Sequence, residues 1–179
     1  MILIETKRLV LRQFKQEDWR DLHEYLSQES VLKYEPGTIS DEDDCKNIAT
    51  ARSQDNTFWA VCLKDTNKMI GHIYFEQKEP KEFLTWVIGY IFNPAFYGKG
   101  YATEACQRIL KYGFEELGVH RVIALCNPEN EPSWKLLERI SMRREGIFRK
   151  EVFFKTTING QPMWQDTYQY AILKEELIP

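Results

Sequence analysis

The sequence predicts an α/β fold in which a mixed β-sheet carries helices on both faces. Its 179 residues are the usual length of one such domain and too few for two. Apolar segments of strand length alternate with segments whose apolar residues recur at helical spacing. No repeat, low-complexity tract or linker divides the chain, so we expect a single domain over residues 1–179.

The first predicted elements are a strand and two helices. Residues 9–14 are apolar and partly alternating, which is typical of a strand. Trp19, Leu22 and Tyr25 then recur at helical spacing and predict a helix over about residues 16–28. Ser40 precedes four acids, residues 41–44, and marks a second helix start, because acids near a helix N-terminus complement its dipole. The same acids could attract a cationic substrate, an interpretation that ranks below capping.

Three strands and a long helix are predicted next. Residues 58–63 and 69–75 are joined by a polar hairpin turn, and the apolar run over 84–92 indicates a strand covered on both faces. A helix is expected over about residues 101–117, ending at Gly118.

The last third predicts a strand over 121–126, a short helix over 133–139 and a hairpin. The hairpin strands lie near 147–156 and 164–173 and are joined at Asn159-Gly160. The predicted order is therefore β-α-α-β-β-β-α-β-α-β-β.

Composition excludes several classes of protein. The net charge is −3 and no basic cluster is present, so we expect no nucleic-acid binding. No apolar run approaches the ~20 residues of a membrane span, and the N-terminus lacks the apolar segment of a signal peptide. The four cysteines are far apart and form no Cys-x-x-Cys pair, which indicates reduced thiols, no zinc site and a cytoplasmic location.

Residues 93–105 are the most informative segment, because they join a predicted buried strand to the long helix through Gly98 and Gly100. Glycine lets the backbone adopt unusual dihedral angles and approach a ligand closely. The unpaired N–H groups of the first helical turn, with the helix dipole, suit a pyrophosphate, and Lys99 adds a positive charge. A strand-to-helix turn that binds nothing explains these residues about equally well.

The two familiar nucleotide motifs do not match this segment. A dinucleotide fingerprint requires a third glycine where this chain has Thr103. It also requires an acid near the end of the next strand, which here reads Leu125-Cys126-Asn127. A nucleotide P-loop ends in Gly-Lys-Ser/Thr, and Gly98-Lys99-Gly100 does not.

Residues 88–94, followed by 97–105, resemble the signature of the GCN5-related N-acetyltransferases, the GNAT family. The similarity is greatest to its RimJ/RimL-like branch, and residues 6–12, 130–146 and 159–173 agree with that branch in order and spacing. The resemblance implies a central, twisted, mostly antiparallel sheet of about seven strands flanked by four helices. It also implies a cytoplasmic acetyltransferase that uses acetyl-CoA as co-substrate and needs no metal.

The resemblance further implies roles for particular residues. The backbone of Gly98 to Ala102, with Thr103, would hold the coenzyme A pyrophosphate, and a strand bulge at Ile91 and Phe92 would bind the pantetheine arm and supply an oxyanion donor. Asn130 would hold the cofactor arm, and Ser133 would protonate the leaving thiolate. A helix cap is the alternative for both. The implied cofactor contacts are Ile91, Phe92, Tyr97, Gly98, Lys99, Gly100, Tyr101, Ala102, Thr103, Asn130 and Ser133.

The chain also departs from the family pattern. Tyr97 stands where the first motif usually opens with Gln or Arg, and Ser141-Met142 replaces a common Gly-Phe pair. Leu137 stands where many members carry a tyrosine general acid, so that role passes to Ser133 or to no residue. The loss of this tyrosine favours a second hypothesis, a non-catalytic acyl-CoA sensor or partner-binding domain.

The expected acceptor is a primary amine, either a protein N-terminus or a small molecule, that attacks the thioester directly. An α-amino group needs little help to lose its proton at pH 7, whereas a lysine needs a placed base. Neither this acceptor nor the oligomeric state can be read from the sequence, and a homodimer stays open. The candidate bases are Glu76, Glu104, Glu151, His72 and His120, and a ping-pong route through Cys126 is disfavoured. Trp59, Tyr74, Trp86 and Tyr90 could line an apolar substrate pocket, but core packing is the more common fate of such residues. The resemblance implies that Phe153 and Trp164, on the final hairpin, lie near the acceptor groove.

Overall fold

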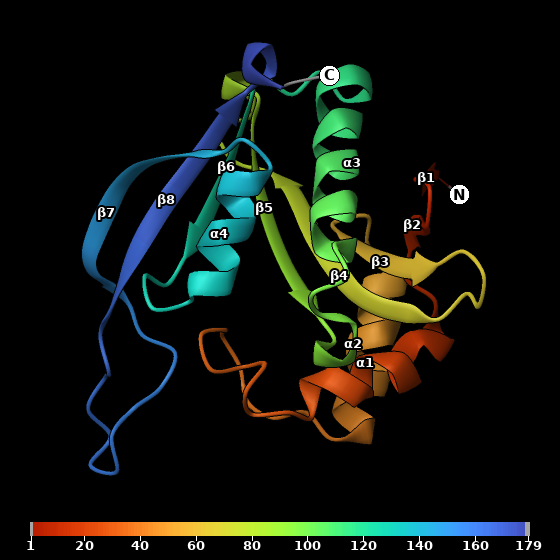
Figure 1. Ribbon diagram of the computed structural model, residues 1–179. Helices are drawn as coiled ribbons and strands as arrows, with labels where there is room; N and C mark the ends of the chain where they lie inside the picture. The colour runs from red at the N-terminus through yellow and green to blue at the C-terminus, as the bar shows by residue number, and fades with distance from the viewer. Residues whose placement is uncertain (1, 178–179) are drawn as a thin grey trace.

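Eight strands form one mixed sheet in the order β1-β2-β3-β4-β5-β6-β8-β7 (Figure 1). The computed structural model describes residues 2–177, so Met1 and residues 178–179 of the predicted domain lie outside the described residues. Neighbouring strands pair antiparallel, except for β5 and β6, which run parallel. The strands are β1 (Leu3–Glu5), β2 (Leu9–Gln13), β3 (Phe58–Leu63), β4 (Met69–Gln77), β5 (Thr85–Phe92), β6 (Arg121–Cys126), β7 (Arg143–Val152) and β8 (Gln165–Leu173).

The mixed α/β fold is confirmed, with one strand more than the seven predicted. The additional strand is β1, whose three residues pair with β2 and are too few to show an alternating pattern. Strand β7 begins four residues before the predicted position 147, because this exposed edge strand opens with polar residues. The hairpin connection is also longer than predicted, since residues 153–164 separate β7 from β8 and hold only one isolated bridge, between Thr156 and Pro162.

Four helices accompany the sheet, namely α1 (Trp19–Leu26), α2 (Glu42–Ser53), α3 (Tyr101–Glu116) and α4 (Glu131–Arg139). The acidic start of α2 is a reciprocal cap, as expected, although Asp41 rather than Ser40 is the N-cap residue. The Asp41 carboxylate accepts a hydrogen bond from the Asp44 N–H at 2.9 Å, and the Asp44 carboxylate accepts one from the Asp41 N–H at 3.1 Å. Asp41 and Asp44 therefore cap the N-terminus of α2, as the capping interpretation predicted. No helix within residues 2–177 is long and apolar enough to cross a membrane.

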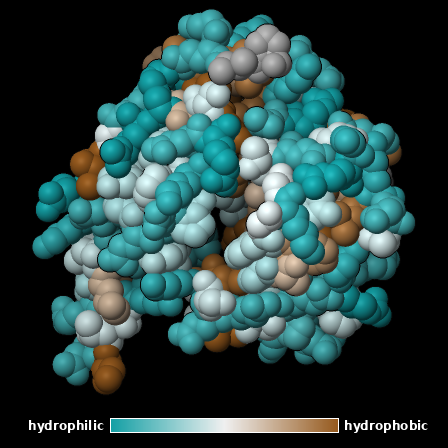
Figure 2. All heavy atoms as spheres, in the orientation of Figure 1, coloured by the Kyte–Doolittle hydropathy of each residue, from teal (hydrophilic) through white to brown (hydrophobic). Residues whose placement is uncertain are grey.

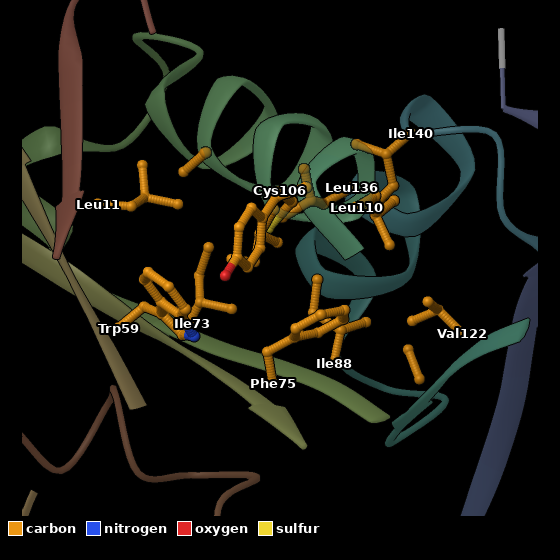
Figure 3. Packing of buried hydrophobic residues seen from close by; sticks show 14 of the residues in the cluster. Leu11, Trp59, Ile73, Phe75, Ile88, Cys106, Leu110, Val122, Leu136 and Ile140 are labelled. Atoms are coloured by element: carbon orange, nitrogen blue, oxygen red, sulfur yellow. The ribbon is translucent and has the colours of Figure 1, made fainter. Parts of the chain in front are cut away.

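Each face of the sheet has its own core. Successive side chains of β3 point to opposite faces, so Trp59 and Val61 pack on the side of α3 and α4, whereas Ala60 and Cys62 pack on the side of α1 and α2. Helices α3 and α4 lie together on one side of the sheet (Figure 1). Figure 3 shows the larger core beneath α3, where Leu11, Trp59, Ile73, Phe75, Ile88, Cys106, Leu110, Val122, Leu136 and Ile140 are labelled.

The parallel strands β5 and β6 pair over three residues only and then separate. Their register joins Thr85 to Arg121 and ends at Val87 and Ile123. The bulge expected at Ile91 and Phe92 is absent, since the register of β5 with β4 is continuous from Gln77–Trp86 to Gly71–Phe92. Most of β5 is half-buried rather than covered on both faces, because beyond Val87 it borders an opening in the sheet.

Candidate active site

A cleft of about 250 Å³ fills the opening between β5 and β6. Its walls come from β5, β6, the start of α4, the β7–β8 hairpin and the loop that precedes α2. Figure 2 shows the same face of the molecule hollowed near its centre, between α4 and the N-terminal end of α3. The separation of two parallel strands therefore provides a ligand-sized space inside the sheet.

The backbone of β5 presents free polar groups to this cleft. The Asn93 N–H donates to Ile70 of β4, and the Thr85 carbonyl accepts from Lys78, so the odd-numbered residues of β5 hydrogen-bond toward β4. By the alternation of a regular strand, the even-numbered residues Ile88, Tyr90 and Phe92 face the open edge. Of the two predicted backbone contacts, Phe92 thus presents its N–H to the open edge, whereas Ile91 faces β4.

Tyr90 links the cleft wall to α4. Its hydroxyl donates to the Ser133 carbonyl oxygen at 2.9 Å and lies 3.1 Å from Ser133 Oγ. Asn130 occupies the N-cap position of α4, but its side chain makes no capping hydrogen bond. Both Asn130 and Ser133 line the cleft, as does the buried Leu137. Asn130 therefore stands at the cap position without capping the helix through its side chain, and its amide is free to meet a ligand.

The glycine loop, residues 97–100, leads from β5 into α3. Gly98 and Gly100 have φ angles of +73° and +77°, in the left-handed region that favours glycine. No side chain caps α3, and the first helical N–H to bond back is that of Glu104, which donates to the Gly100 carbonyl at 3.1 Å. The N–H groups of Tyr101, Ala102 and Thr103 precede it, and their surroundings are partly open to solvent. This arrangement fits an anionic phosphate.

Arg8 holds the glycine loop in place, a role for which the sequence carried no local signal. Its Nη1 donates to the Lys99 carbonyl at 2.9 Å, and its guanidinium lies 4.4 Å from the centre of the Tyr101 ring. Its Nε donates to Glu104 Oε2 at 2.7 Å, and Thr6 Oγ1 donates to Glu104 Oε1 at 2.5 Å. The Glu104 carboxylate is thus engaged in an ion pair and hydrogen bonds that hold the loop, which removes it from the candidate bases.

Glu35 is the second residue that sequence reasoning missed, because Glu35-Pro36-Gly37 has the composition of an ordinary turn and carries no catalytic motif. The structure places Glu35 in the wall of the cleft, half-buried, and burial raises the pKa of its carboxyl to about 7. Burial raises the pKa of Tyr90, Cys126 and Tyr97, and the nearby charge of Glu35 raises each of them further. These residues lie on β5, at the end of β6 and in the glycine loop.

The other predicted bases divide into near and distant groups. Glu151 lines the cleft. Glu76 is hydrogen-bonded to Tyr74, and His120 is exposed at the opposite end of β6. His72 is buried in the α1–α2 core, where Tyr25 Oη lies 2.6 Å from its Nδ1 and burial lowers its pKa well below the usual value. Neither histidine lines the cleft.

Cys126 also lines the cleft, but its chemistry does not suit a nucleophile. Burial raises the pKa of its thiol to about 12, so the thiolate is scarce at neutral pH. Within residues 2–177, no three His, Cys, Asp or Glu side chains gather in an arrangement that could hold a metal ion.

A second groove of about 540 Å³ continues from the cleft along the β7–β8 hairpin. The two spaces share Tyr34, Asn127, Gln165 and Asp166. Trp164 lines the second groove and packs against Phe153, with ring centres 5.1 Å apart. Of the four central aromatics, Tyr90 alone lines the cleft, whereas Trp59 is buried and Trp86 stacks on Phe75.

Comparison with known proteins agrees with this geometry. A family model described as an acetyltransferase (GNAT) domain matches residues 8–143. YnaD of Bacillus subtilis (strain 168), described as an uncharacterized N-acetyltransferase, is 44% identical over 97% of this chain and 98% of its own. The [ribosomal protein uS5]-alanine N-acetyltransferase of Escherichia coli (strain K12) is 27% identical over 99% of this chain and 94% of its own. The crystal structure of a GNAT-family acetyltransferase from Bacillus anthracis is 42% identical, with a TM-score of 0.87, and covers 98% of this chain and 100% of that chain.

Proposed function

The chain belongs to the GNAT family of N-acetyltransferases, in its RimJ/RimL-like branch, and we propose that it transfers the acetyl group of acetyl-CoA to a primary amine by direct attack within the cleft. The observation that carries this proposal is the continuity of β5. One strand forms the cleft wall with its open edge and leads, through the short 3-10 turn Pro94–Phe96, into the glycine loop. Residues 1–179 would form one catalytic domain.

The residues present fit acetyl-CoA. The N–H groups of Gly98 to Ala102, with Thr103, would hold the pyrophosphate, and Lys99 would add a positive charge beside it. The open edge of β5 offers the N–H groups of Tyr90 and Phe92 along the path of the pantetheine arm, and Asn130 offers its uncapped amide. Acetyl-CoA supplies the activated acetyl group when bound, and the chain's own groups orient it.

Direct attack requires an uncharged amine and a way to stabilise the oxyanion. An open-edge N–H of β5 would donate to the thioester oxygen as negative charge develops there. Ser133 Oγ would protonate the departing sulfur, and the hydrogen bond with Tyr90 would orient it. The high pKa of the Cys126 thiol argues against an acetyl-cysteine intermediate.

The acceptor amine is either an α-amino group or a small-molecule amine. Neutralising an α-ammonium group at pH 7 costs about 1 kcal/mol, compared with roughly 4–5 kcal/mol for a lysine side chain. The second groove would let an acceptor larger than a single amino acid extend along the hairpin past Trp164. The name of the Escherichia coli relative specifies the alanine of a ribosomal protein, which supports a protein N-terminus as the first acceptor to test.

The first experiment is calorimetric titration of the protein with acetyl-CoA, using NAD as the control ligand. Submicromolar to micromolar binding of acetyl-CoA, without binding of NAD, is expected. A panel containing an alanyl peptide, a blocked lysine amide and spermidine then identifies the acceptor by release of free thiol. Absence of acetyl-CoA binding by the folded protein would refute the acetyltransferase proposal. Tight binding without turnover of any amine would favour the alternative, a non-catalytic acyl-CoA sensor.

A further inference from the structure

We propose that Glu35 is the general base that removes the proton from the acceptor amine. This inference rests on the proposed function, because it assigns a residue to the reaction in the same cleft. Glu35 belongs to the loop between α1 and α2, which is far in sequence from the glycine loop and from α4. Only the tertiary structure brings its carboxyl group to the cleft.

The position of Glu35 is defined from several directions. Its neighbours Tyr34 and Pro36 also line the cleft, so the whole turn forms part of the wall. Tyr90 on β5 and Cys126 at the end of β6 line the same cleft, and the charge of Glu35 adds to the effect of burial in raising their pKa values. The carboxyl group therefore lies beside the opening into which the proposed oxyanion donors of β5 point.

Glu35 is also an acid of the cleft wall whose carboxylate is free to accept a proton. Among the described residues its carboxylate has no hydrogen-bond or ion-pair partner, and burial raises its pKa to about 7. Asp166, across the cleft, accepts a hydrogen bond from the Lys150 N–H at 2.9 Å and pairs with Arg149 at 3.2 Å. Glu151 also lines the cleft without a hydrogen-bond or ion-pair partner among the described residues, but its side chain is exposed to solvent, whereas Glu35 is half-buried.

The other titratable groups around Glu35 whose pKa values are shifted do not exchange a proton near pH 7. Tyr90 and Tyr97 have pKa values raised by burial, and the thiol of Cys126 has a pKa of about 12, so all three stay protonated. The cleft lining includes no Lys, Arg or His side chain that would hold Glu35 ionised at lower pH. A carboxylate with a pKa of about 7 matches the requirement for a base that works at neutral pH.

The Glu35 carboxylate takes one proton from the ammonium form of the acceptor and later releases it to water. The neutral nitrogen forms a C–N bond to the acetyl carbonyl carbon, and the C–S bond then breaks. The Ser133 hydroxyl proton passes to the sulfur, and the remaining surplus proton on nitrogen replaces it, so the products are an amide and a thiol.

The test compares Glu35→Gln with Glu29→Gln, a matched change at an exposed acid just upstream in the same interhelical loop. For the alanyl peptide, kcat/KM of Glu35→Gln is expected to fall about 100- to 1,000-fold at pH 7.5. The inflection near pH 7 in the wild-type profile is expected to disappear. Glu35→Asp should recover part of the activity with an altered profile, and Glu29→Gln should match wild type. Acetyl-CoA affinity should stay within about twofold in all variants.

Stability provides a readout that does not depend on turnover. Because burial raises the pKa of Glu35, ionisation of its carboxyl destabilises the fold as pH rises from about 4.5 to above 7. Glu35→Gln should therefore raise Tm relative to wild type at about pH 8.5 and not at about pH 4.5.

Two outcomes would overturn the role of Glu35 while leaving the proposed function intact. One is a Glu35→Gln enzyme whose kcat/KM lies within about threefold of wild type with the same pH inflection. The other is lost acetyl-CoA affinity in Glu35→Gln, which would make Glu35 part of the cofactor site. By contrast, wild-type protein that binds no acetyl-CoA, or binds it and acetylates no amine, would refute the proposed function and the role of Glu35 together.

Discussion

Replacing Gly100 by alanine tests whether the shape of the glycine loop, and not merely the stability of the fold, determines cofactor binding. Gly100 is the N-cap residue of α3 and has a φ of +77°, and Gly118 follows the other end of α3 with a φ of +69°. A Cβ atom at Gly100 would meet only Arg8 Nη2, at 3.5 Å, and one at Gly118 would meet nothing within 4 Å. Gly100 and Gly118 therefore have similar backbone strain and similar free space for a side chain, and they differ in that only Gly100 adjoins the proposed phosphate site.

The expected magnitudes follow from this geometry. A non-glycine residue in the left-handed region costs about 1–2 kcal/mol, so Gly100→Ala and Gly118→Ala should lower the free energy of unfolding by similar amounts. For a domain of this size, Tm should fall by roughly 2–8 °C in both variants.

Cofactor affinity should separate the two positions. In Gly100→Ala the loop can relax away from the left-handed conformation, and acetyl-CoA binding must then restore that conformation. The conformational cost of about 1–2 kcal/mol would weaken acetyl-CoA binding about 5- to 30-fold. Gly100→Asp adds a negative charge beside the proposed pyrophosphate site. Two like charges about 4 Å apart near a protein surface repel by about 4 kcal/mol, so affinity should fall at least about 100-fold. Gly118→Ala and Gly118→Asp should bind acetyl-CoA like wild type.

The assay is calorimetric titration with acetyl-CoA, with thermal unfolding measured on the same samples. Equal affinities of Gly100→Asp and Gly118→Asp would refute the assignment of the phosphate site to the glycine loop. Equal affinities of the two alanine variants alone would show that the loop keeps its conformation under strain. The aspartate pair therefore carries the decisive comparison.

Three further predictions follow from individual contacts. Cys126→Ala should retain turnover, and intact-mass spectrometry of wild type with acetyl-CoA should detect no acetyl-enzyme, because the thiol has a pKa of about 12. Arg12 and Asp18 form a buried ion pair at 2.8 Å, so Arg12→Ala should cost about 3–5 kcal/mol in chemical denaturation, whereas Lys46→Ala, which breaks an exposed pair, should change stability little. Burial raises the pKa of Glu104, but hydrogen bonds from Thr6 and Arg8 outweigh this effect and leave the pKa below 4.5. The ionised carboxylate therefore stabilises the fold above about pH 4.5, and this stabilisation is lost as the pH falls below that value. Acid should accordingly lower the Tm of Glu104→Gln less steeply than that of wild type.

Local patterns in the sequence were sufficient for most of the secondary structure. The short apolar run of residues 58–63, the helix expected over about residues 101–117 and its end at Gly118 each depend on neighbours within a few positions. The structure confirms them, with α3 ending at Glu116. The same holds for the unusual dihedral angles of Gly98 and Gly100. Elements without a periodic apolar pattern were harder to predict, as the three-residue β1 and the exposed start of β7 show.

The cleft could not be derived from the chain in the same way. The resemblance implied a bulge at Ile91 and Phe92, but the backbone of β5 is regular and the opening arises from its separation from β6. The length over which two strands stay paired depends on everything packed around them, and no residue of β5 alone encodes it.

The sequence by itself determined the fold class, the glycine loop and the family, because each depends on residue types at short, fixed spacings. Only the tertiary structure placed Arg8 against the glycine loop and Glu35 in the wall of the cleft. Both residues are many positions away from the loop and strands that they meet, and both lie in unremarkable local sequence. Long-range contacts of this kind are decided by the packing of the whole sheet and its helices, which is why they became visible only in the folded chain.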